Sequence, residues 1–461
     1  AHNHDTRLIF PGDPGGQPGK MLFKAHSANQ YEFDDNGGGT YSPAPGLLAS
    51  LTRNAGPPVT YRIVDPRQAT YTFDEFGKLL SWADPQGHTW TYSYDGTGRL
   101  DRITDDTGLR YLDLDYDGQG RIQRVADHTG RDVTFGYDPA GDLISVTDAE
   151  DLVWTYAYDA NHRLRQALDP NSLQIVRTEY DAQGRAYQQY DGADNLVIQV
   201  TYNPDGTTTF TDAIGNQTTH AYDERNTLTG TTNDLGDSAS RTYDPNFRPQ
   251  SLVDENTNST QLVWSSNGAN LTQITDAENN QIDLTYNSLN SLTQITDGRS
   301  FVTTYTYNEA DPDPTRRTLL LSVQDALNKI ISYTYTTAAD TPQPPGLLKT
   351  ITDPNGNVTQ FIYDSFGQRI QMIDPLLNST LYGYDSLGRL KIVEDPLGQS
   401  NWSCYDAAGR IVRSVANASG DGGSPQTDPC DTANYQPSSD PAFDRITTSV
   451  YDNAGNLIAT I

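Results

Sequence analysis

Aromatic residues alternate with small or polar residues along most of this chain. In Tyr92-Ser93-Tyr94 and Tyr382-Gly383-Tyr384, for example, one small residue separates two aromatic residues. On a β-strand the two aromatic residues share a face, and the residue between them points to the other face. The pattern therefore predicts many short strands, each with an aromatic face and a second face that is solvated or closely packed.

Each predicted strand is followed by a turn signal at a fixed position. Residues 94–100 show its commonest form, Tyr-Asp-x-x-Gly-Arg-Leu. An Asp that opens a turn accepts nearby backbone N–H groups, and a Gly that closes it supplies a positive φ. A second turn, such as Asp353-Pro354-Asn355-Gly356, ends each unit. Each repeat is thus predicted to hold two strands and two tight turns.

The first turn returns at intervals of 20 to 22 residues through most of the chain. A fixed period of this size indicates a repeat architecture, in which each unit packs mainly on its neighbours. The residues that define the repeat are Tyr94, Asp95, Gly98, Tyr116, Asp117, Gly120, Tyr137, Asp138, Gly141, Tyr158, Asp159, Tyr180, Asp181, Gly184, Tyr363, Asp364, Gly367, Tyr384, Asp385, Gly388, Tyr405, Asp406, Gly409, Tyr451, Asp452 and Gly455.

Two features around the first turn need a structural explanation. Apolar residues return after it in pairs three apart, such as Leu100 and Ile103. Strict alternation would place such a pair on opposite faces, so either a β-bulge resets the strand or both faces are partly buried. Arginines also follow the turn Gly, and we expect them to pair with the turn Asp; they are Arg99, Arg121, Arg185, Arg389 and Arg410.

The composition fits a thin sheet better than a thick core. Only 35% of the residues are hydrophobic, and Tyr occurs 28 times against 12 for Phe. A tyrosine combines a large apolar ring with a hydroxyl that can reach water, which suits a wall that is never fully dry. The net charge of −29 comes largely from the Asp turns and disfavours binding to nucleic acid, which requires clustered Lys and Arg.

The recurring Tyr-Asp-x-x-Gly-Arg/Lys-Leu and Asp-Pro-x-Gly motifs resemble the YD repeats of the RHS family. That family includes bacterial polymorphic toxins, shell-forming components of insecticidal toxin complexes, and animal teneurins. The resemblance covers about residues 61–461. It implies an all-β fold in which tandem antiparallel β-hairpins form a long twisted, spiralling sheet or β-shell, and in the toxin members this shell encloses a cargo.

The chain is predicted to have two parts. Residues 1–60 depart from the period and are expected to form a divergent lead-in that caps the first edge, with short strands near 21–23 and 31–33. Residues 61–461 are expected to form the repeat array. Insertions interrupt the array near 309–318, 336–346 and 417–443, and long loops on a regular scaffold are common places for recognition.

The two cysteines give information about the cellular compartment of the protein. Cys404 precedes Tyr405 in a predicted strand, and Cys430 lies in the Gly/Ser/Pro-rich insertion 417–443. The placement favours a disulfide that ties the insertion to the sheet, while two unpaired thiols are the alternative. A disulfide is typical of an oxidising, extracellular environment. The chain does not begin with Met, which we interpret as a start left by a removed signal peptide.

The sequence offers little for catalysis. It contains no Gly-x-Ser-x-Gly, His-Glu-x-x-His, P-loop or Cys-x-x-Cys motif, and no apolar run long enough for a transmembrane helix. Asp353-x-Asn355 resembles part of a calcium loop, but the downstream Glu is missing. We therefore expect no enzyme activity, no cofactor and no bound metal.

Two functions remain as hypotheses. The first is a secreted structural or cell-surface protein that assembles through its sheet edges into a filament or sheath and presents its loops to a protein or carbohydrate partner. Residues 455–461 would then meet the segment 22–33 of the next copy. The second is a piece of an RHS-type shell that encapsulates a toxin cargo encoded further downstream.

Overall fold

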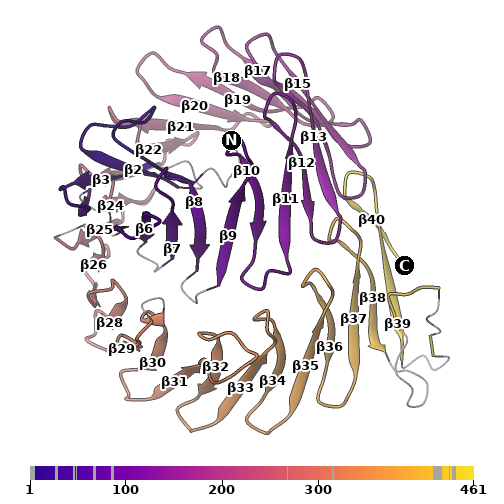
Figure 1. Ribbon diagram of the computed structural model, residues 1–461. Coiled ribbons are helices and arrows are strands. Elements are labelled where there is room, and N and C mark those ends of the chain that lie inside the picture. The colour runs from indigo at the N-terminus through magenta and orange to yellow at the C-terminus, as the bar shows by residue number, and fades with distance from the viewer. Residues whose placement is uncertain are drawn as a thin grey trace. The chain divides into compact units, whose positions relative to one another are not determined.

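The regular structure of this protein consists of β-strands throughout the part of the chain that is described (Figure 1). A computed structural model describes residues 6–25, 30–44, 47, 49–65, 69–84, 88–266, 268–313, 316–418, 428–433, 435, 437–438 and 443–461. Part of the predicted insertion 417–443 and residues 314–315 of the insertion 309–318 therefore lie outside the described residues.

The lead-in forms a four-stranded antiparallel sheet in the order β1-β2-β3-β4. Its strands are β1 (Arg7–Ile9), β2 (Lys20–Lys24), β3 (Gln30–Asp35) and β4 (Tyr41–Pro43). Strands β2 and β3 have a partner strand on both sides, so neither has an edge to offer to another copy. The predicted docking of 455–461 on the segment 22–33 is therefore wrong.

The strands that follow are successive antiparallel hairpins, which confirms the predicted all-β class and its hairpin repeats. They begin before the predicted boundary at residue 60. The first six are β5 (Ser50–Asn54), β6 (Thr60–Val64), β7 (Thr70–Phe73), β8 (Leu79–Ala83), β9 (Thr89–Tyr94) and β10 (Leu100–Thr104).

The next run comprises β11 (Tyr111–Tyr116), β12 (Ile122–Asp127), β13 (Asp132–Tyr137), β14 (Leu143–Thr147), β15 (Val153–Tyr158), β16 (Leu164–Leu168), β17 (Gln174–Tyr180), β18 (Ala186–Tyr190), β19 (Leu196–Tyr202), β20 (Thr208–Asp212), β21 (Gln217–Tyr222), β22 (Leu228–Asn233) and β23 (Ser238–Tyr243). The third run comprises β24 (Pro249–Val253), β25 (Ser259–Trp264), β26 (Leu271–Thr275), β27 (Gln281–Tyr286), β28 (Leu292–Thr296), β29 (Val302–Tyr307), β30 (Leu320–Gln324), β31 (Ile330–Tyr335), β32 (Leu348–Thr352) and β33 (Val358–Tyr363). The last comprises β34 (Arg369–Ile373), β35 (Ser379–Tyr384), β36 (Leu390–Glu394), β37 (Ser400–Tyr405), β38 (Ile411–Ala418), β39 (Arg445–Tyr451) and β40 (Leu457–Thr460).

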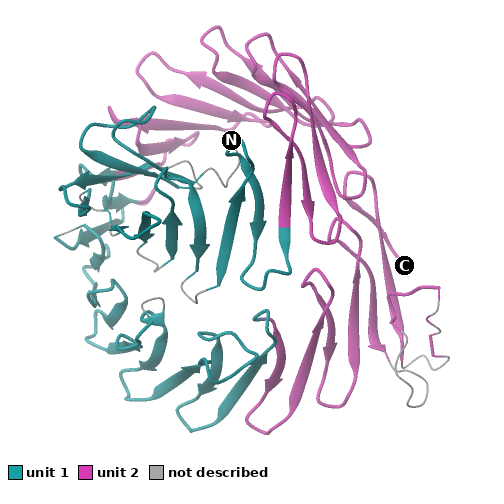
Figure 2. Cartoon of the chain, viewed as in Figure 1, with its two compact units in different colours: residues 1–111, 242–253, 257–367 teal, residues 112–241, 254–256, 368–461 magenta. Residues whose placement is uncertain are grey.

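The chain divides into two compact units that each combine early and late repeats (Figure 2). Unit 1 contains 1–111, 242–253 and 257–367, and unit 2 contains 112–241, 254–256 and 368–461. Within each unit, segments far apart in the sequence are therefore packed together.

A β-bulge explains the spacing of the apolar pairs. Tyr94 lies opposite Leu100 and Tyr92 lies opposite Ile103, with a register shift between them. Residues directly opposite each other in an antiparallel pair share a face, so both apolar residues join the aromatic face. The same shift recurs in later repeats, for example between β13 and β14 and between β35 and β36. The bulge, one of the two alternatives from the sequence, is therefore the correct one.

The best-buried core lies where the lead-in meets the first hairpins. Phe33, Ile63 and Phe73 are each 0% exposed, and Met21 and Leu8 are 2% exposed. These residues belong to one cluster that joins β1–β3 to β5–β8. Phe23 contacts both Tyr71 and Phe73, at ring-centroid distances of 5.1 and 6.0 Å. The lead-in therefore covers the aromatic face of the first hairpins.

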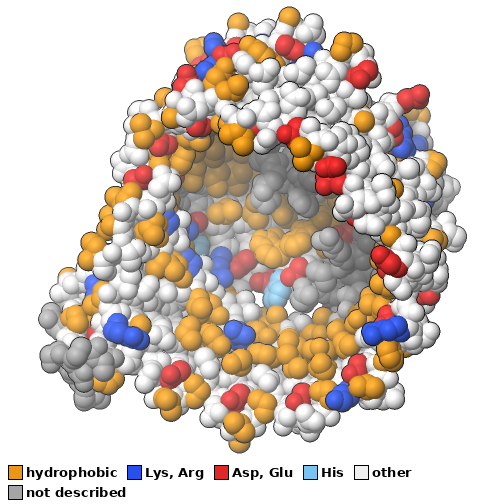
Figure 3. Space-filling model, turned by 180° about the vertical axis from the view of Figure 1, so that it is seen from behind, with side chains coloured by type: hydrophobic (Ala, Val, Ile, Leu, Met, Phe, Trp, Pro, Cys, Tyr) orange, Lys and Arg blue, Asp and Glu red, His pale blue; other side chains and the backbone are white. Residues whose placement is uncertain are grey.

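Elsewhere the aromatic face is only partly buried. In β15, Trp154, Tyr156 and Tyr158 are all of intermediate exposure. Figure 3 shows that hydrophobic side chains stand at the surface on the face in view, mixed with single acidic and basic side chains. Most of the array therefore depends on something other than a dry core.

Candidate functional site

The first turn of each repeat is built around its Asp. Asp95 accepts hydrogen bonds through Oδ1 from the backbone N–H groups of Thr97 and Arg99, both at 2.9 Å, while Oδ2 accepts one from Nε of Arg99 at 2.9 Å. The turn closes with the N–H of Gly98 bonded to the carbonyl of Asp95 at 2.8 Å, and Gly98 has a φ of +84°. One carboxylate thus satisfies two backbone donors and one guanidinium.

The same arrangement repeats along the array. The five expected arginines pair with their turn Asp residues, with N–O distances of 2.6 to 2.8 Å. The Tyr of each defining motif is the last residue of its strand. The Gly residues of these motifs, from Gly98 to Gly455, all have positive φ.

Some repeats depart from this arrangement. At Asp138 the residue four positions on is Asp142, which offers only its backbone N–H, at 2.9 Å. At Asp452 that residue is Asn456, which bonds through both its backbone and its side chain. The turn therefore forms without an ion pair, and the Arg adds a contact that not every repeat has.

In five repeats the Arg also contacts the Tyr of the following repeat. The guanidinium carbon of Arg121 lies 4.4 Å from the ring centroid of Tyr137. The hydroxyl of Tyr137 donates to the carbonyl of Ile122, the residue after that Arg, at 2.9 Å. Both contacts recur for the pairs Arg163 and Tyr180, Arg185 and Tyr202, Arg389 and Tyr405, and Arg410 and Tyr451.

This series of contacts, which we name the Asp–Arg–Tyr ladder, explains why the motif reads Tyr-Asp-x-x-Gly-Arg-Leu. Asp holds its own turn and orients the Arg, and the Arg then supports the next Tyr through a cation–π contact. The hydroxyl bond explains the preference for Tyr over Phe. In β25, which ends in Trp264 instead, the indole Nε1–H donates to the carbonyl of Pro249 at 2.8 Å. The sequence predicted the turn and the ion pair but gave no signal for the contact between repeats.

The ladder keeps its carboxylates charged. Hydrogen bonds from the guanidinium of Arg163 and from backbone N–H groups lower the pKa of Asp159 to about 2. In the second turn at Asp127, burial alone would raise the pKa, but hydrogen bonds from Thr129 and Arg131 outweigh it and bring the pKa to about 2. Burial raises the pKa of Tyr137, Tyr307 and Tyr335, so these rings stay protonated and able to donate.

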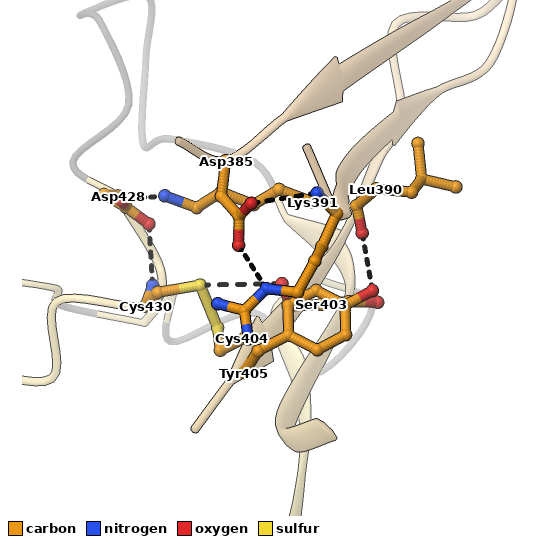
Figure 4. The surroundings of a disulfide bond; sticks show 9 residues. Asp385, Leu390, Lys391, Ser403, Cys404, Tyr405, Asp428 and Cys430 are labelled. Atoms are coloured by element: carbon orange, nitrogen blue, oxygen red, sulfur yellow. Dashed lines mark hydrogen bonds and ion pairs between the residues drawn. A yellow bond between two sulfur atoms is a disulfide. The ribbon is translucent and has the colours of Figure 1, made fainter. Parts of the chain in front are cut away.

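The insertion after β38 is fastened to the sheet by the cysteines (Figure 4). Cys404 and Cys430 form a disulfide, and Lys391 forms an ion pair with Asp428 beside it. Further along, Tyr435 is 7% exposed and bonds through its hydroxyl to Asp444, whose other oxygen accepts the N–H of Ser438 at 2.6 Å. The described part of the insertion is therefore a packed element.

The other two insertions also make contacts within the fold. Nε of Arg317 donates to the carbonyl of Asp311 at 2.8 Å. In the insertion 336–346, Thr336 is 2% exposed and donates to the carbonyl of Pro344 at 2.6 Å. The side chain of Gln343 accepts the N–H of Tyr363 at 2.8 Å. These contacts fix the bases of the two insertions.

A second set of contacts joins early repeats to late ones inside each unit. In unit 1 the guanidinium carbon of Arg110 lies 4.5 Å from the ring centroid of Phe366. In unit 2, Nη1 of Arg131 donates to the carbonyl of Ala407 at 2.6 Å, and the N–H of Ala408 donates to Glu150 at 3.0 Å. In all three cases a second turn of an early repeat meets a first turn of a late repeat.

We call these contacts the turn seam. The partners in unit 2 are 276 and 258 residues apart in sequence, so the period of about 21 residues could not reveal them. The one signal in the sequence was Phe366, an aromatic residue at a turn tip where most repeats have a small or polar one.

The described residues show no arrangement typical of a metal or membrane site. Among them, no group of three or more His, Cys, Asp and Glu residues is placed to hold a metal ion. No helix in the same residues is long and apolar enough to span a membrane. What the ladder and the seam can do is hold a long sheet in a fixed register.

Comparisons with known proteins agree with the repeat pattern. The family model of the teneurin YD-shell matches residues 60–236, and that of the RHS repeat matches 346–376. No curated protein matches the sequence.

Several similar solved structures contain the proteins TcdB2 and TccC3. TcdB2-TccC3 without its hypervariable C-terminal region is 15% identical, with a TM-score of 0.42, over 89% of this chain and 26% of that one. The Photorhabdus luminescens Tc holotoxin pore is 12% identical, with a TM-score of 0.40, over 96% of this chain and 29% of that one. This chain thus spans about a quarter of the length of these structures. The two family matches confirm the predicted resemblance to YD/RHS repeats in residues 60–236 and 346–376.

Proposed function

We propose that this chain is a wall segment of a secreted or cell-surface protein container, and that its aromatic face contacts an enclosed polypeptide. The observation that carries the proposal is the packing of the lead-in on the aromatic face of the first hairpins. Phe23, Phe33 and Met21 are inserted against the aromatic face of β5–β8, where they are almost fully buried. The same face continues through later hairpins with intermediate exposure, for example at Tyr156. This uncovered part of the aromatic face is therefore apolar surface of the same kind as the part that the lead-in covers.

Two further observations support the proposal. The family matches are to a YD-shell and to RHS repeats, and the similar solved structures include a Tc holotoxin pore. The disulfide between Cys404 and Cys430 suits an oxidising compartment, as expected of a secreted or surface protein.

The test uses a polypeptide that cannot fold. Reduced and carboxymethylated α-lactalbumin, labelled with a fluorophore, is titrated with the whole chain, and binding is followed by fluorescence anisotropy. We expect Tyr156→Ser to weaken binding by about fivefold or more, because buried aromatic residues contribute strongly to association.

The control is Val153→Ser in the same strand. Val153 is 43% exposed, and its position three residues from Tyr156 places it on the opposite face. Its replacement should leave binding unchanged. No binding by the wild-type chain, or an equal loss in both variants, would contradict the proposal.

The second candidate function is a self-assembling extracellular filament or sheath. Its support comes from large apolar residues at turn tips, including Ile214, Leu235 and Leu376, each more than four-fifths exposed. In a filament or sheath, these side chains would be covered by a neighbouring copy.

A further inference from the structure

Two buried N–H groups on neighbouring strands have no hydrogen-bond partner. In the described part of the chain, the buried side-chain atoms left in this state are Nε of Arg316, Nε1 of Trp402 and Nε of Arg413. Trp402 lies in β37 and Arg413 in β38, and these two strands pair with each other. A buried donor without an acceptor has lost its hydration and gained nothing, so it destabilises the fold. Two of them on adjacent strands therefore indicate that an acceptor is missing.

The two donors share a face of the sheet with the disulfide. Trp402 lies opposite Val415, and Cys404 lies opposite Arg413. Directly opposite residues of an antiparallel pair share a face, as do residues two apart in a strand, so these four residues stand on one face. Cys404 is bonded to Cys430 of the insertion after β38. The insertion is therefore fastened to the face that carries both donors.

This face is dry beside the insertion. Val415 is 0% exposed, Cys404 is 6% exposed and Tyr435 is 7% exposed. The guanidinium carbon of Arg413 lies 5.8 Å from the ring centroid of Tyr435. That contact attracts the positive charge. It does not satisfy the Nε–H, which still has no acceptor.

The same place carries positive charge that is not fully compensated. The net charge of the chain is −29, and the arginines of the Asp–Arg–Tyr ladder are each paired with an Asp. Arg413, in contrast, takes part in none of the ion pairs between described residues. A second cation, Nζ of Lys391, lies 5.4 Å from the ring centroid of Trp402 and pairs with Asp428 beside the disulfide (Figure 4). The acceptor that fits here is therefore negatively charged.

We propose that a small oxyanion binds between the insertion and β37–β38, where it accepts hydrogen bonds from Nε1 of Trp402 and from Nε of Arg413. Carboxylate and phosphate groups both match the planar donor geometry of a guanidinium. Because both donors are buried, the insertion moves aside locally when the anion enters, and the disulfide between Cys404 and Cys430 keeps it attached. The bound anion then supplies the acceptors that the closed arrangement lacks.

This site is separate from the proposed polypeptide-binding face. Tyr405 follows Cys404 directly in β37, so its ring points to the other, aromatic face of the sheet. A failure of one proposal therefore leaves the other intact.

The indole N–H of Trp402 reports on binding directly. The whole oxidised chain is labelled with nitrogen-15 tryptophan, and the signal that disappears in Trp402→Phe identifies Trp402. Acetate and inorganic phosphate are then added separately at constant ionic strength. We expect the Trp402 signal to move downfield and to saturate, with acetate if the site takes a carboxylate and with phosphate if it takes a phosphate. The signal of Trp264 is the internal control, because its Nε1–H already donates to the carbonyl of Pro249 at 2.8 Å and should not respond.

Two variants separate the Arg413 site from a general effect of charge. Arg413→Met keeps a long apolar side chain beside Tyr435 and removes both the donor and the charge. Its apparent affinity for the anion should fall by about tenfold or more, because hydrogen bonds between charged groups are strong. Arg445→Met is the matched control, since Arg445 is exposed and lies opposite Ala416, on the other face of the adjacent strand. It loses the same charge and should bind like the wild type.

The wild-type titration decides the proposal even if Arg413→Met does not fold, which circular dichroism would show. A Trp402 signal that stays in place with both anions would overturn the proposal, and so would a shift that grows without saturation. Equal affinity in Arg413→Met and Arg445→Met would also contradict it.

Discussion

Phe73 and Tyr384 occupy the same position of the repeat, yet different forces hold them. Phe73 is 0% exposed beneath the lead-in sheet, in contact with Phe23. Tyr384 is partly exposed and donates its hydroxyl to the carbonyl of Arg369 at 2.9 Å. The first hairpins are therefore stabilised mainly by apolar burial, and the later ones depend more on polar contacts between repeats.

The difference shows that the same strand pattern occurs both in a sheet covered by a second layer and in a sheet without a dry core. Where a second layer covers the aromatic face, the ring needs no hydroxyl, and Phe is suitable. Where no dry core forms, the Tyr hydroxyl fixes the ring against the preceding repeat, and in five repeats an Arg contact adds to it. The Asp–Arg–Tyr ladder thus lets the sheet continue without a thick core.

Removal of an aromatic ring should give the largest difference in stability loss between the two regions. We expect Phe73→Ala to lower the free energy of unfolding of β6–β8 by about 3–5 kcal/mol, because it leaves a cavity in the best-packed part of the protein. Tyr384→Ala should cost about half as much in β35. Native-state hydrogen exchange of each segment measures both values, and equal losses would contradict the comparison.

Loss of the disulfide should have the next largest effect. The bond closes a loop with a sequence separation of 26. In the chain-entropy model, Cys404→Ser together with Cys430→Ser should therefore cost about 3–4 kcal/mol. The loss should appear in the exchange rates around 411–418 and 428–451, while β1–β8 keep their protection. Faster exchange in β1–β8 would show that the two regions are not independent.

Removal of one hydroxyl tests the ladder itself. Tyr384→Phe leaves the ring in place and removes the donor to the carbonyl of Arg369. We expect a loss of about 1 kcal/mol in β34–β36, the usual net value of a hydrogen bond. The control is Phe73→Tyr, which places a hydroxyl in a site that is 0% exposed and should destabilise through overpacking. If Tyr384→Phe leaves the free energy of unfolding of β34–β36 unchanged, the hydroxyl does not stabilise this region and the prediction is wrong.

The ion pair of the turn should matter least. Asp385→Asn keeps the Oδ1 acceptor for the backbone N–H groups of Leu387 and Arg389, and loses the charged Oδ2 that accepts from Nε of Arg389, so the cost should stay below about 1 kcal/mol. The chain already uses this replacement, since Asn287 accepts the N–H groups of Leu289 and Ser291 in an equivalent turn. Asp385→Ala, which removes the acceptors as well, should cost more in the same denaturant titration.

The repeat itself could be predicted from the sequence because its chemistry is local. The order Tyr-Asp-x-x-Gly gives a strand end, a turn opener and a position for positive φ within five residues. Asp95 and Gly98 have these roles in the structure. The Arg pairing followed from the same short spacing, as Arg99 shows.

The remaining features depend on contacts between residues far apart in sequence. Phe23 lies in a segment without the period, so nothing in its surroundings indicated that it would cover Tyr71 and Phe73. The seam contact between Arg131 and Ala407 spans 276 residues. The bulge that brings Leu100 opposite Tyr94 was one of two alternatives, because spacing alone did not distinguish them.

The response of the two regions to acid tests the central claim most directly. In the array the pKa of both Asp159 and Asp223 is about 2. The largest cause for Asp159 is the hydrogen bond from the side chain of Arg163, and for Asp223 it is the hydrogen bond from the backbone N–H of Thr227. Unfolded Asp has a pKa of about 3.9. Because the folded pKa is the lower one, these groups stabilise the fold fully above about pH 4, and their contribution is lost as the pH falls towards about 2.

Hydrogen exchange, corrected for the intrinsic rate at each pH, should therefore be followed from pH 6 to pH 2. We predict that strands β15–β23, which carry these turns, lose protection between about pH 4 and pH 2, while β6–β8 keep theirs because apolar burial does not titrate. Strands β2 and β3 are left out of the comparison because the ion pair between Lys20 and Glu32 joins them and lowers the pKa of Glu32. Loss of protection in β6–β8 at the same pH as in β15–β23, or at a higher pH, would contradict the distinction between a buried region and a region held by the ladder.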